Sequence, residues 1–415
     1  MDDIYIIGVG MTPFGKHAAL SVKDLTRQAV AAALQDAGAF RENIGAAYFG
    51  NAGQGALEGQ FMVPGEIALR DAGFETIPVI NVENACASAS TALHQACAHV
   101  KAGLSEVALA VGAEKMFVED RARMFGVFDG AWDVHRWRAN LDALWSLAED
   151  FPLPPEALAD TGQRSVFMDV YASLSRYHMK SFGSTQRQLA AVAAKNHFHS
   201  SMNPLSQYRN TLTVEEVLQA RLVSWPLTLP MCAPISDGAA AAIVCHKSAL
   251  SRFDAKRAVR VAASVLASGS NRKAEEWDKH LCRIAALKAY HEAAVGPEDM
   301  SVAEVHDATA FAEILQTENL GFCAFGEGGV LAERGETKLG GRIPINVSGG
   351  LESKGHPIGA TGLGQVFELA TQLRGEAGER QVVGARFAIA ENGGGFHGFE
   401  EAAACITILA APGKA

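Results

Sequence analysis

The sequence lacks the features that mark a membrane protein or an exported protein. No apolar run approaches the ~18 residues that a membrane-spanning helix requires. The first residues, Met1 to Tyr5, have neither the basic flank nor the apolar stretch of a secretory signal, and the final Gly-Lys-Ala is not a peroxisomal address. We therefore expect a protein that does not associate with membranes.

Cysteine is sparse and scattered. The chain has seven cysteines in 415 residues, an odd number, with no CxxC pair and no spacing typical of a metal site. The glycines at 359, 362 and 364 do not have the spacing of a dinucleotide fingerprint, and there is no P-loop. We expect free thiols in a reducing cytoplasm, with no metal and no redox cofactor.

Basic residues are outnumbered, which argues against binding to nucleic acid. Lys plus Arg number 36 against 46 Asp plus Glu, a formal charge of −10. Hydrophobic residues make up 48% and charged residues 20%, a composition that excludes disorder and predicts an ordinary globular protein of two or three domain-sized units. An anionic ligand must therefore find a local basic patch.

Strand-like apolar runs alternate with helical patterns in two stretches of the chain. In the first stretch the runs are 4–9, 46–49, 78–82, 107–111 and 239–244, with helices at 21–38, after the N-cap residue Ser21, and at 87–102. In the second stretch the runs are 259–266, 302–306, 343–347 and 387–390, with helices at 283–294, 309–320 and 357–373. This alternation predicts an α/β fold with mainly parallel sheets between helices.

The two stretches indicate an internal duplication around an insertion. Ile80-Asn81-Val82 and Ile345-Asn346-Val347 each lead into a helix and then another strand. Residues 117–225 break this pattern, with tryptophans and a mixed helical pattern. We therefore divide the chain into an N-terminal half (1–116 plus 226–250), an inserted loop domain (117–225) that covers the active site, and a C-terminal half (251–415).

Cys86 is the strongest candidate for a nucleophile. It lies between a predicted strand and the start of a small-residue helix, where the helix dipole and free backbone N–H groups lower a thiol pKa from ~8.5. Cysteine is also among the most buried residue types, so a packing role is the alternative.

Two histidines favour a functional role for Cys86. His306 and His356 each follow a strand-like run, and ligands bind off the carboxyl ends of strands in such folds, so we expect them to meet Cys86 there, with Gly393–Gly395.

At this point the sequence resembles a thiolase, of the kind similar to sterol-carrier-protein-type thiolases. The resemblance rests on segments in family order along nearly the whole chain. They are 84–90 (NACASAS), 195–199 (KNHFH), 234–240 (PISDGAA), 305–307 (VHD), 348–362 (SGGLESKGHPIGATG) and 392–395 (NGGG). The family fold is a duplicated α-β-α-β-α sandwich of five layers.

The resemblance implies an enzyme with a cysteine acyl-enzyme. Its implied activity is thiolytic cleavage of a 3-oxoacyl-coenzyme A, or the reverse Claisen condensation, in fatty acid or lipid metabolism. Cys86 matches the nucleophile, His356 the histidine that activates it, and His306 a histidine of one oxyanion hole. The backbone N–H groups of Cys86 and Gly393 match the second oxyanion hole. Coenzyme A is a substrate in this family, and its expected contacts are His197, His199, Ser348 and Gly349.

The resemblance also bears on assembly. The family forms homodimers or dimers of dimers, so we expect the same of this chain. Some bacterial relatives pair with a small zinc-ribbon/OB subunit, so such a partner is a further option. The aromatic residues of the insertion, Phe125, Phe128, Trp132 and Trp137, either shape an acyl pocket or pack in a core.

The chain departs from the family at its second catalytic cysteine. Glu391 and Ala308 occupy the two positions where thiolases carry an acid/base cysteine, and Cys323 is the nearest remaining thiol in sequence. Three alternatives follow for the role of this cysteine. Glu391 transfers the proton, with a pKa raised by burial, or a histidine transfers it. In the third alternative, Glu391 is only a structural carboxylate. Two further alternatives are a ketoacyl-synthase-like condensing or acyl-transfer enzyme, in which decarboxylation supplies the enolate, and an inactive acyl-CoA- or lipid-binding subunit.

Overall fold

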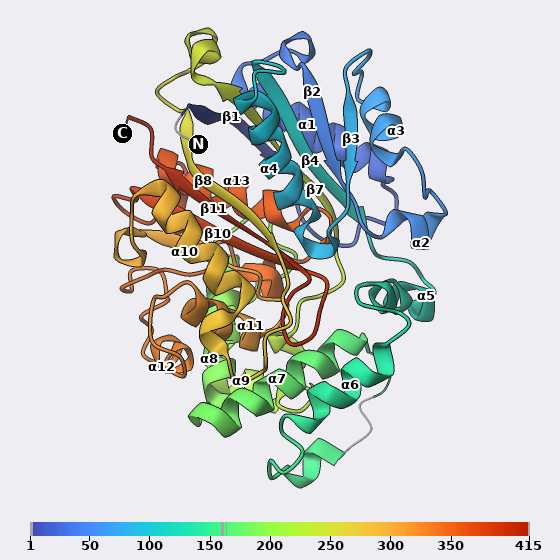
Figure 1. The fold of residues 1–415 in the computed structure, drawn as a ribbon, viewed down its shortest axis with the longest axis vertical. Helices are drawn as coiled ribbons and strands as arrows, with labels where there is room; N and C mark the ends of the chain where they lie inside the picture. The colour runs from blue at the N-terminus through green and yellow to red at the C-terminus, as the bar shows by residue number, and fades with distance from the viewer. Residues whose placement is uncertain (1–2, 159–161, 163, 414–415) are drawn as a thin grey trace.

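A single sheet of nine strands forms the centre of the molecule (Figure 1). The computed structural model describes residues 3–158, 162 and 164–413. The strand order is β3-β2-β4-β7-β1-β8-β11-β10-β9. The strands are β1 (Ile4–Met11), β2 (Ala46–Gly50), β3 (Val79–Val82), β4 (Val107–Lys115), β7 (Asp237–His246), β8 (Val259–Ser268), β9 (Val302–Glu304), β10 (Phe387–Gly394) and β11 (Ala403–Ala410).

The order of the strands shows the predicted duplication. Outward from the pairing of β1 with β8, the first half runs β1-β7-β4-β2-β3 and the second half runs β8-β11-β10-β9. The place that corresponds to β3 in the second half holds only an isolated bridge between Ala303 and Ile345. Each half therefore repeats one topology, and the two halves join through the pairs Tyr5–Arg260 and Ile6–Val259.

Two expectations about strands are wrong. The pairs β2–β3, β2–β4 and β9–β10 are parallel, but the other five pairs of this sheet are antiparallel, because β7 and β11 return beside the first strand of their halves. The expected strand 343–347 does not form either. Pro344 has no N–H for a ladder, and Asn346 has φ 55°, with its side chain accepting from the N–H of Val305 at 2.8 Å.

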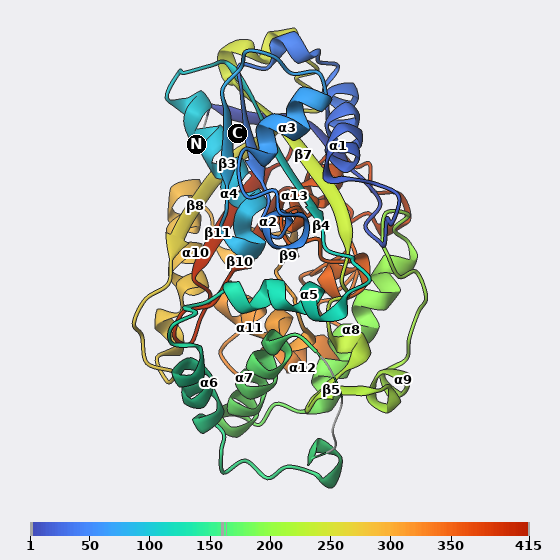
Figure 2. The ribbon, with the colours of Figure 1, turned by 90° about the vertical axis from the view of Figure 1, so that its right-hand side faces the viewer.

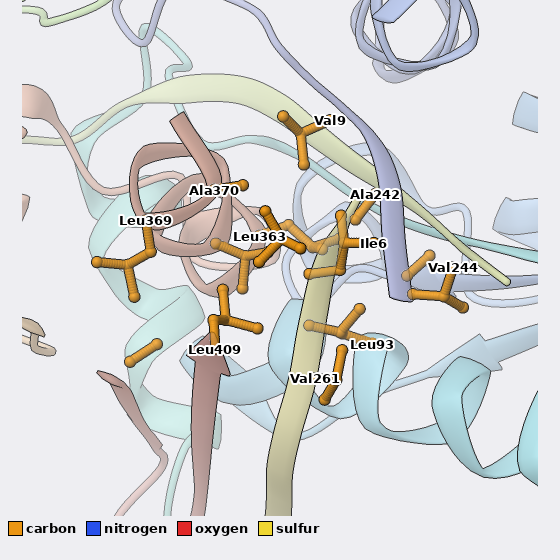
Figure 3. Packing of buried hydrophobic residues seen from close by; sticks show 14 of the residues in the cluster. Ile6, Val9, Leu93, Ala242, Val244, Val261, Leu363, Leu369, Ala370 and Leu409 are labelled. Carbon is orange, nitrogen blue, oxygen red and sulfur yellow. The ribbon is translucent and has the colours of Figure 1, made fainter. Parts of the chain in front are cut away.

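Helices complete the layers of the predicted sandwich. The helices α4 (Ser88–Lys101) and α13 (Thr361–Arg374) lie between the two halves of the sheet and contact both. Figure 3 shows Leu93 of α4 and Leu363 of α13 beside Ile6, Val261 and Leu409 of the strands. The helix α1 (Val22–Ala37) covers the outer face of β1, β4 and β7, and α10 (Leu281–Ala293) covers that of β8 and β11.

Local sequence signals fix the ends of α1 as expected. Ser21 is the N-cap, its hydroxyl accepts from the N–H of Asp24 at 3.2 Å, and the Asp24 carboxylate accepts from the N–H of Ser21. Gly38 ends the helix in the left-handed conformation (φ 59°), which glycine adopts without steric cost.

The residues between β4 and β7 build a mostly helical layer beyond one end of the sheet. In both views the inserted helices lie there, near α11 (Ala310–Asn319) and α12 (Gly328–Glu333) (Figure 2). The inserted elements are α5 (Arg121–Gly126), α6 (Trp137–Ser146), α7 (Val166–Phe182), α8 (Gln186–Ser201), α9 (Val214–Gln219) and the hairpin β5 (Leu222–Ser224) and β6 (Leu227–Thr228). Among the described residues, no helix has both the length and the apolar character needed to span a bilayer.

Two strand glycines allow the loops that carry the candidate catalytic residues to approach the sheet. A Cβ at Gly112 of β4 would lie 2.2 Å from the carbonyl oxygen of Gly359. A Cβ at Gly394 of β10 would lie 2.1 Å from the carbonyl oxygen of Asn84. Both distances are below van der Waals contact, so these positions require glycine.

We expect Gly112→Ala to lower the free energy of unfolding by ~1–3 kcal/mol, because the added methyl must push the Gly359 backbone away. Urea denaturation of the variant and the wild type measures this. Gly130→Ala is the control, since a Cβ there meets nothing within 4 Å. Equal stability of Gly112→Ala and the wild type would show that the loop yields freely.

Candidate active site

Cys86 lies in a tight 3-10 turn, Ala85–Ala87, between β3 and α4. Ala85 has φ 47°, in the left-handed region that disfavours a side chain. Hydrogen bonds hold the turn: the N–H of Ala85 donates to Glu83 at 2.6 Å, and the N–H of Asn84 donates to the Ser88 hydroxyl at 2.9 Å. This turn directs the thiol into a cavity.

The structure brings Cys86, His306 and His356 together. The thiol sulfur and one ring nitrogen of each histidine all lie within 4.8 Å of one another. The two imidazole rings are 5.1 Å apart between centroids, at 66°. The cavity at this site has a volume of about 520 Å³, and all three residues line it.

Hydrogen bonds define the tautomer of His356. Its Nδ1 lies 2.6 Å from the hydroxyl oxygen of Thr361, and that hydroxyl donates its own proton to the carbonyl of Pro357 at 3.1 Å. The Thr361 oxygen must therefore accept from Nδ1–H, which leaves Nε2 unprotonated. Burial lowers the pKa of His356 well below its usual value, so the ring is neutral and Nε2 is a base.

His306 is a neutral ring, and neither of its nitrogens has a hydrogen-bond partner within the described residues. It is 3% exposed, and burial lowers its pKa to about 4. Its backbone N–H donates to Glu391 at 2.9 Å, which fixes the main chain at this position. The ring can therefore donate its single N–H to a carbonyl or enolate oxygen in the cavity.

The inserted segment supplies more than half of the residues that line the cavity. Its contribution is largely aromatic and methionine-rich: Phe117, Met124, Phe125, Phe128, Phe167, Met168 and Tyr171. Lys16, Arg121, Arg164 and Arg221 add positive charge to the lining. Trp132 instead packs on Phe167, 5.9 Å between ring centroids, and Trp137 is 43% exposed and outside the cavity.

The expectation that Cys86 has a lowered pKa and is a thiolate is wrong. Burial raises the pKa of this thiol to about 12, and the negative charges of Glu114 and Glu83 add to the rise. The backbone N–H groups of Cys86 and Gly395 oppose it, but they are too weak to outweigh the loss of water. The thiol is therefore protonated at neutral pH and must pass its proton to a neighbour when it attacks.

The backbone donor beside Cys86 is Gly395 and not Gly393. Gly395 lines the cavity, and its N–H favours the charged form of the thiol. Gly393 is directed to the other side of β10, where a Cβ would lie 2.5 Å from the Glu401 side chain. The backbone N–H that acts on the Cys86 sulfur is therefore that of Gly395, two residues beyond Gly393.

Glu391 lies behind His306 and outside the cavity lining. Its carboxylate accepts from the N–H of His306 and lies 3.4 Å from the Cys282 sulfur. Burial and the charge of Glu401 raise its pKa to about 8. This placement matches the structural alternative for Glu391, whereas Ala308, the other position without its cysteine, does line the cavity.

The residues assigned to coenzyme A contacts do not line the cavity. Ser348 is fully buried, donates to Glu304 at 2.5 Å and accepts from Lys354 at 2.7 Å. His197 stacks at 14° on Tyr208, which does line the cavity. Gly349 packs against α8, where a Cβ would lie 2.5 Å from Ser200.

His197 and His199 do not form a metal pair. Both nitrogens of His199 are engaged, one with the carbonyl of Asn346 at 3.0 Å and the other with the N–H of Leu339 at 2.9 Å. No local sequence pattern marks Tyr171, Cys232 or the basic residues of the lining, because they meet Cys86 only through tertiary packing.

Comparisons with known proteins agree with this geometry. Residues 4–216 match the family described as "Thiolase, N-terminal domain", and residues 263–409 match "Thiolase C-terminal domain-like". The chain is 37% identical to an acetyl-CoA acetyltransferase of Methanothermobacter thermautotrophicus, over 96% of this chain and 98% of that protein. It is 36% identical to sterol carrier protein 2 of Gallus gallus, over 94% of this chain and 69% of that protein.

Two further matches are a protein named as a subunit and a solved structure. The chain is 33% identical to "Benzoylsuccinyl-CoA thiolase subunit BbsB" of Thauera aromatica, over 91% of each. Among solved structures, "Ltp2-ChsH2(DUF35) aldolase" matches with a TM-score of 0.77 and 22% identity, covering 100% of this chain and 99% of that one. At this identity the structural match shows the fold alone.

We expect iodoacetamide to alkylate Cys86 slowly at pH 7 and about tenfold faster with each pH unit up to pH 10, because the thiolate fraction rises until the pKa. Mass spectrometry of the Cys86 peptide measures the rate, and Cys86→Ser identifies the peptide. A rate that levels off by pH 8 would show the lowered pKa that the helix dipole alone predicts.

We expect Glu391→Gln to retain activity within a fewfold of wild type, because the amide oxygen can still accept from the N–H of His306. Glu391→Ala should cost more, since that N–H loses its partner and the imidazole shifts. Steady-state kinetics of both variants measure this. A loss of ~10²-fold in Glu391→Gln would instead assign proton transfer to the carboxyl group.

Proposed function

The chain belongs to the thiolase family and is a thiolase-type acyltransferase, and from this premise we propose that it cleaves a 3-oxoacyl-coenzyme A with free coenzyme A, or catalyses the reverse Claisen condensation. The observation that carries the proposal is the meeting of Cys86, His306 and His356 in one cavity. A thiol nucleophile, a neutral base and a neutral N–H donor are the groups that this reaction needs.

Acylation begins with a proton transfer. His356 Nε2 takes the proton of the Cys86 thiol while the sulfur attacks the 3-oxo carbon of the substrate. The oxyanion that forms accepts from the N–H groups of Cys86 and Gly395, the two donors that favour negative charge at this point. Collapse of this intermediate breaks the bond between C2 and C3 and leaves an acyl group on Cys86.

The departing fragment is the enolate of a shorter acyl-coenzyme A. Its oxygen can accept from the N–H of His306, for which the described part of the chain offers no competing partner. Coenzyme A then attacks the acyl-enzyme, and Cys86 regains its proton from His356. The covalent intermediate divides one difficult transfer into two easier ones.

The cavity lining supports recognition of an anionic, pantetheine-bearing substrate. The chain carries a net charge of −10, yet Lys16, Arg121, Arg164 and Arg221 gather at this one cavity. Lys16 and Arg121 lie over aromatic rings of the lining, 5.1 Å from the centroid of Phe117 in the case of Lys16. We assign the phosphates of coenzyme A to this basic group, in place of His197, Ser348 and Gly349.

The acyl group that fits this cavity is bulky and apolar. Four phenylalanines and two methionines face it, and flexible methionines accommodate irregular apolar shapes. The relative named benzoylsuccinyl-CoA thiolase subunit supports an aryl-bearing acyl chain.

Assembly with other subunits is also part of the proposal. Strand β3 is an edge of the sheet, and Ile80 on it is 37% exposed, which supports pairing with a second copy. A relative named as a subunit and a structural neighbour titled with DUF35 support a small partner protein. The seven cysteines are all free, which supports a reducing cytoplasm.

We expect 3-oxoacyl-coenzyme A to add its acyl mass to the protein, and Cys86→Ser to lose this adduct. Intact-mass spectrometry and thiolysis assays across short-chain, long-chain and aryl-bearing substrates measure it, with Cys323→Ser as the matched control. Condensation only with a malonyl-type thioester would identify a decarboxylating enzyme. If no acyl-coenzyme A forms an adduct, the remaining alternative is a non-catalytic binding subunit.

A further inference from the structure

The proposed reaction needs a group that protonates carbon. Cleavage of the C2–C3 bond leaves a carbanion equivalent that must gain a proton, and the incoming coenzyme A thiol must lose one. His356 already holds the proton of Cys86 at this stage. Neither cysteine position of the family supplies the group here, because Ala308 has no proton to give and Glu391 lies outside the cavity lining.

Tyr171 brings a phenol to the lining of the same cavity. It lies on α7 and lines the cavity with Cys86, His306 and Gly395, while only 8% of the residue is exposed. Phe167 and Met168, one turn earlier on α7, also face the cavity, so this side of the helix forms part of its wall. Among the described residues, the phenol hydroxyl has no hydrogen-bond partner.

The surroundings of Tyr171 keep its proton in place. Burial raises its pKa well above the usual value, and the acidic groups Glu401, Cys86 and Glu391, when they are ionised, act in the same direction. The phenol is therefore a proton donor at neutral pH, and its phenolate is a strong base. A group of this kind can protonate a carbanion and afterwards deprotonate a thiol of ordinary pKa ~8.5.

The acidic cluster behind Tyr171 is not a metal site. His280 Nε2, the Cys282 sulfur and a Glu401 oxygen lie within 4.8 Å of one another. However, His280 Nδ1 accepts from the N–H of Cys282 and from the Asn319 amide, both at 3.2 Å. The ring proton must therefore reside on Nε2, which prevents that nitrogen from binding a metal and directs its N–H towards Glu401.

The other thiol of the cavity is placed less well for this role. Cys232 also lines the cavity, but its sulfur lies 3.5 Å from the carbonyl of Thr228, to which it donates. Burial raises the pKa of Cys232, and the charge of Glu352 adds to the rise. Of the two groups, the phenol is the one whose proton is not engaged by another of the described residues.

We propose that Tyr171 is the catalytic acid and base that replaces the missing second cysteine, an assignment that rests on the proposed function. The phenol O–H gives its proton to C2 of the enolate as that carbon forms a C–H bond. The phenolate then removes the proton of the coenzyme A thiol, and the resulting thiolate attacks the acyl-enzyme. Cys86 leaves as a thiolate and takes back the proton held by His356, and the proton from coenzyme A replaces the one that Tyr171 gave to carbon, so the protein ends in its starting protonation state.

The test separates proton transfer to carbon from acylation. We expect Tyr171→Phe to lower thiolysis by ~10²- to 10⁴-fold and to abolish the exchange of the C2 protons of acetyl-coenzyme A with D₂O. Acylation of Cys86 by a saturated acyl-coenzyme A should stay within a fewfold of wild type, because that transfer forms no enolate. Tyr177→Phe, on the same helix and outside the cavity lining, is the matched control.

The remaining outcomes are decisive. Exchange that persists within a fewfold in Tyr171→Phe overturns the assignment, and its loss in Cys232→Ala or Glu391→Gln instead moves the role to that residue. Loss of acylation together with exchange in Tyr171→Phe would show that the ring only shapes the cavity. A wild-type protein that is never acylated would overturn the proposed function itself.

Discussion

Removal of Cys86, His306 and His356 from bulk water is the condition on which the site depends. Burial raises the pKa of the thiol and lowers that of both imidazoles, so all three groups are neutral before substrate arrives. A neutral site contains no ion pair. Charge appears only when the thiol passes its proton to His356, and the oxyanion that forms in this step is what the backbone N–H donors stabilise.

Buried carboxylates hold the loops that surround these three residues. Glu114 accepts backbone N–H groups from Ala52 and Gly53 on one side and from Gly359 on the other, and so joins the loop after β2 to the loop of His356. Glu304 pairs with Lys354 at 3.2 Å in the glycine-rich segment. Breaking one partner of such a buried pair costs about 3–5 kcal/mol, which makes these residues structural requirements of the catalytic geometry.

In the proposed mechanism, a residue from another element of the fold replaces the second cysteine. Tyr171, the proposed proton donor to C2 of the enolate, lies on α7 of the inserted segment. The positions of the missing cysteines belong to the duplicated core. The inserted segment therefore supplies both the acyl pocket and a reacting group. Such a division allows the acyl specificity and the proton chemistry to change together without disturbing the nucleophile and its two histidines.

The sequence by itself determined the identity of the three central residues, the duplication and most element boundaries. Cys86 and His306 each follow a strand, and Ser21 and Gly38 bound α1, because strand ends and helix caps are local properties that a few neighbouring residues decide. The thiolase resemblance added the fold.

Tertiary structure alone decided the charge state of the thiol, the displacement of the backbone donor from Gly393 to Gly395, and the positions of Glu391 and Tyr171. These depend on long-range packing. The pKa of Cys86 reflects burial by segments far away in the chain, and the side of β10 that faces the cavity depends on how closely Gly394 approaches Asn84. Desolvation and side-chain direction result from contacts between distant segments, which no local pattern records.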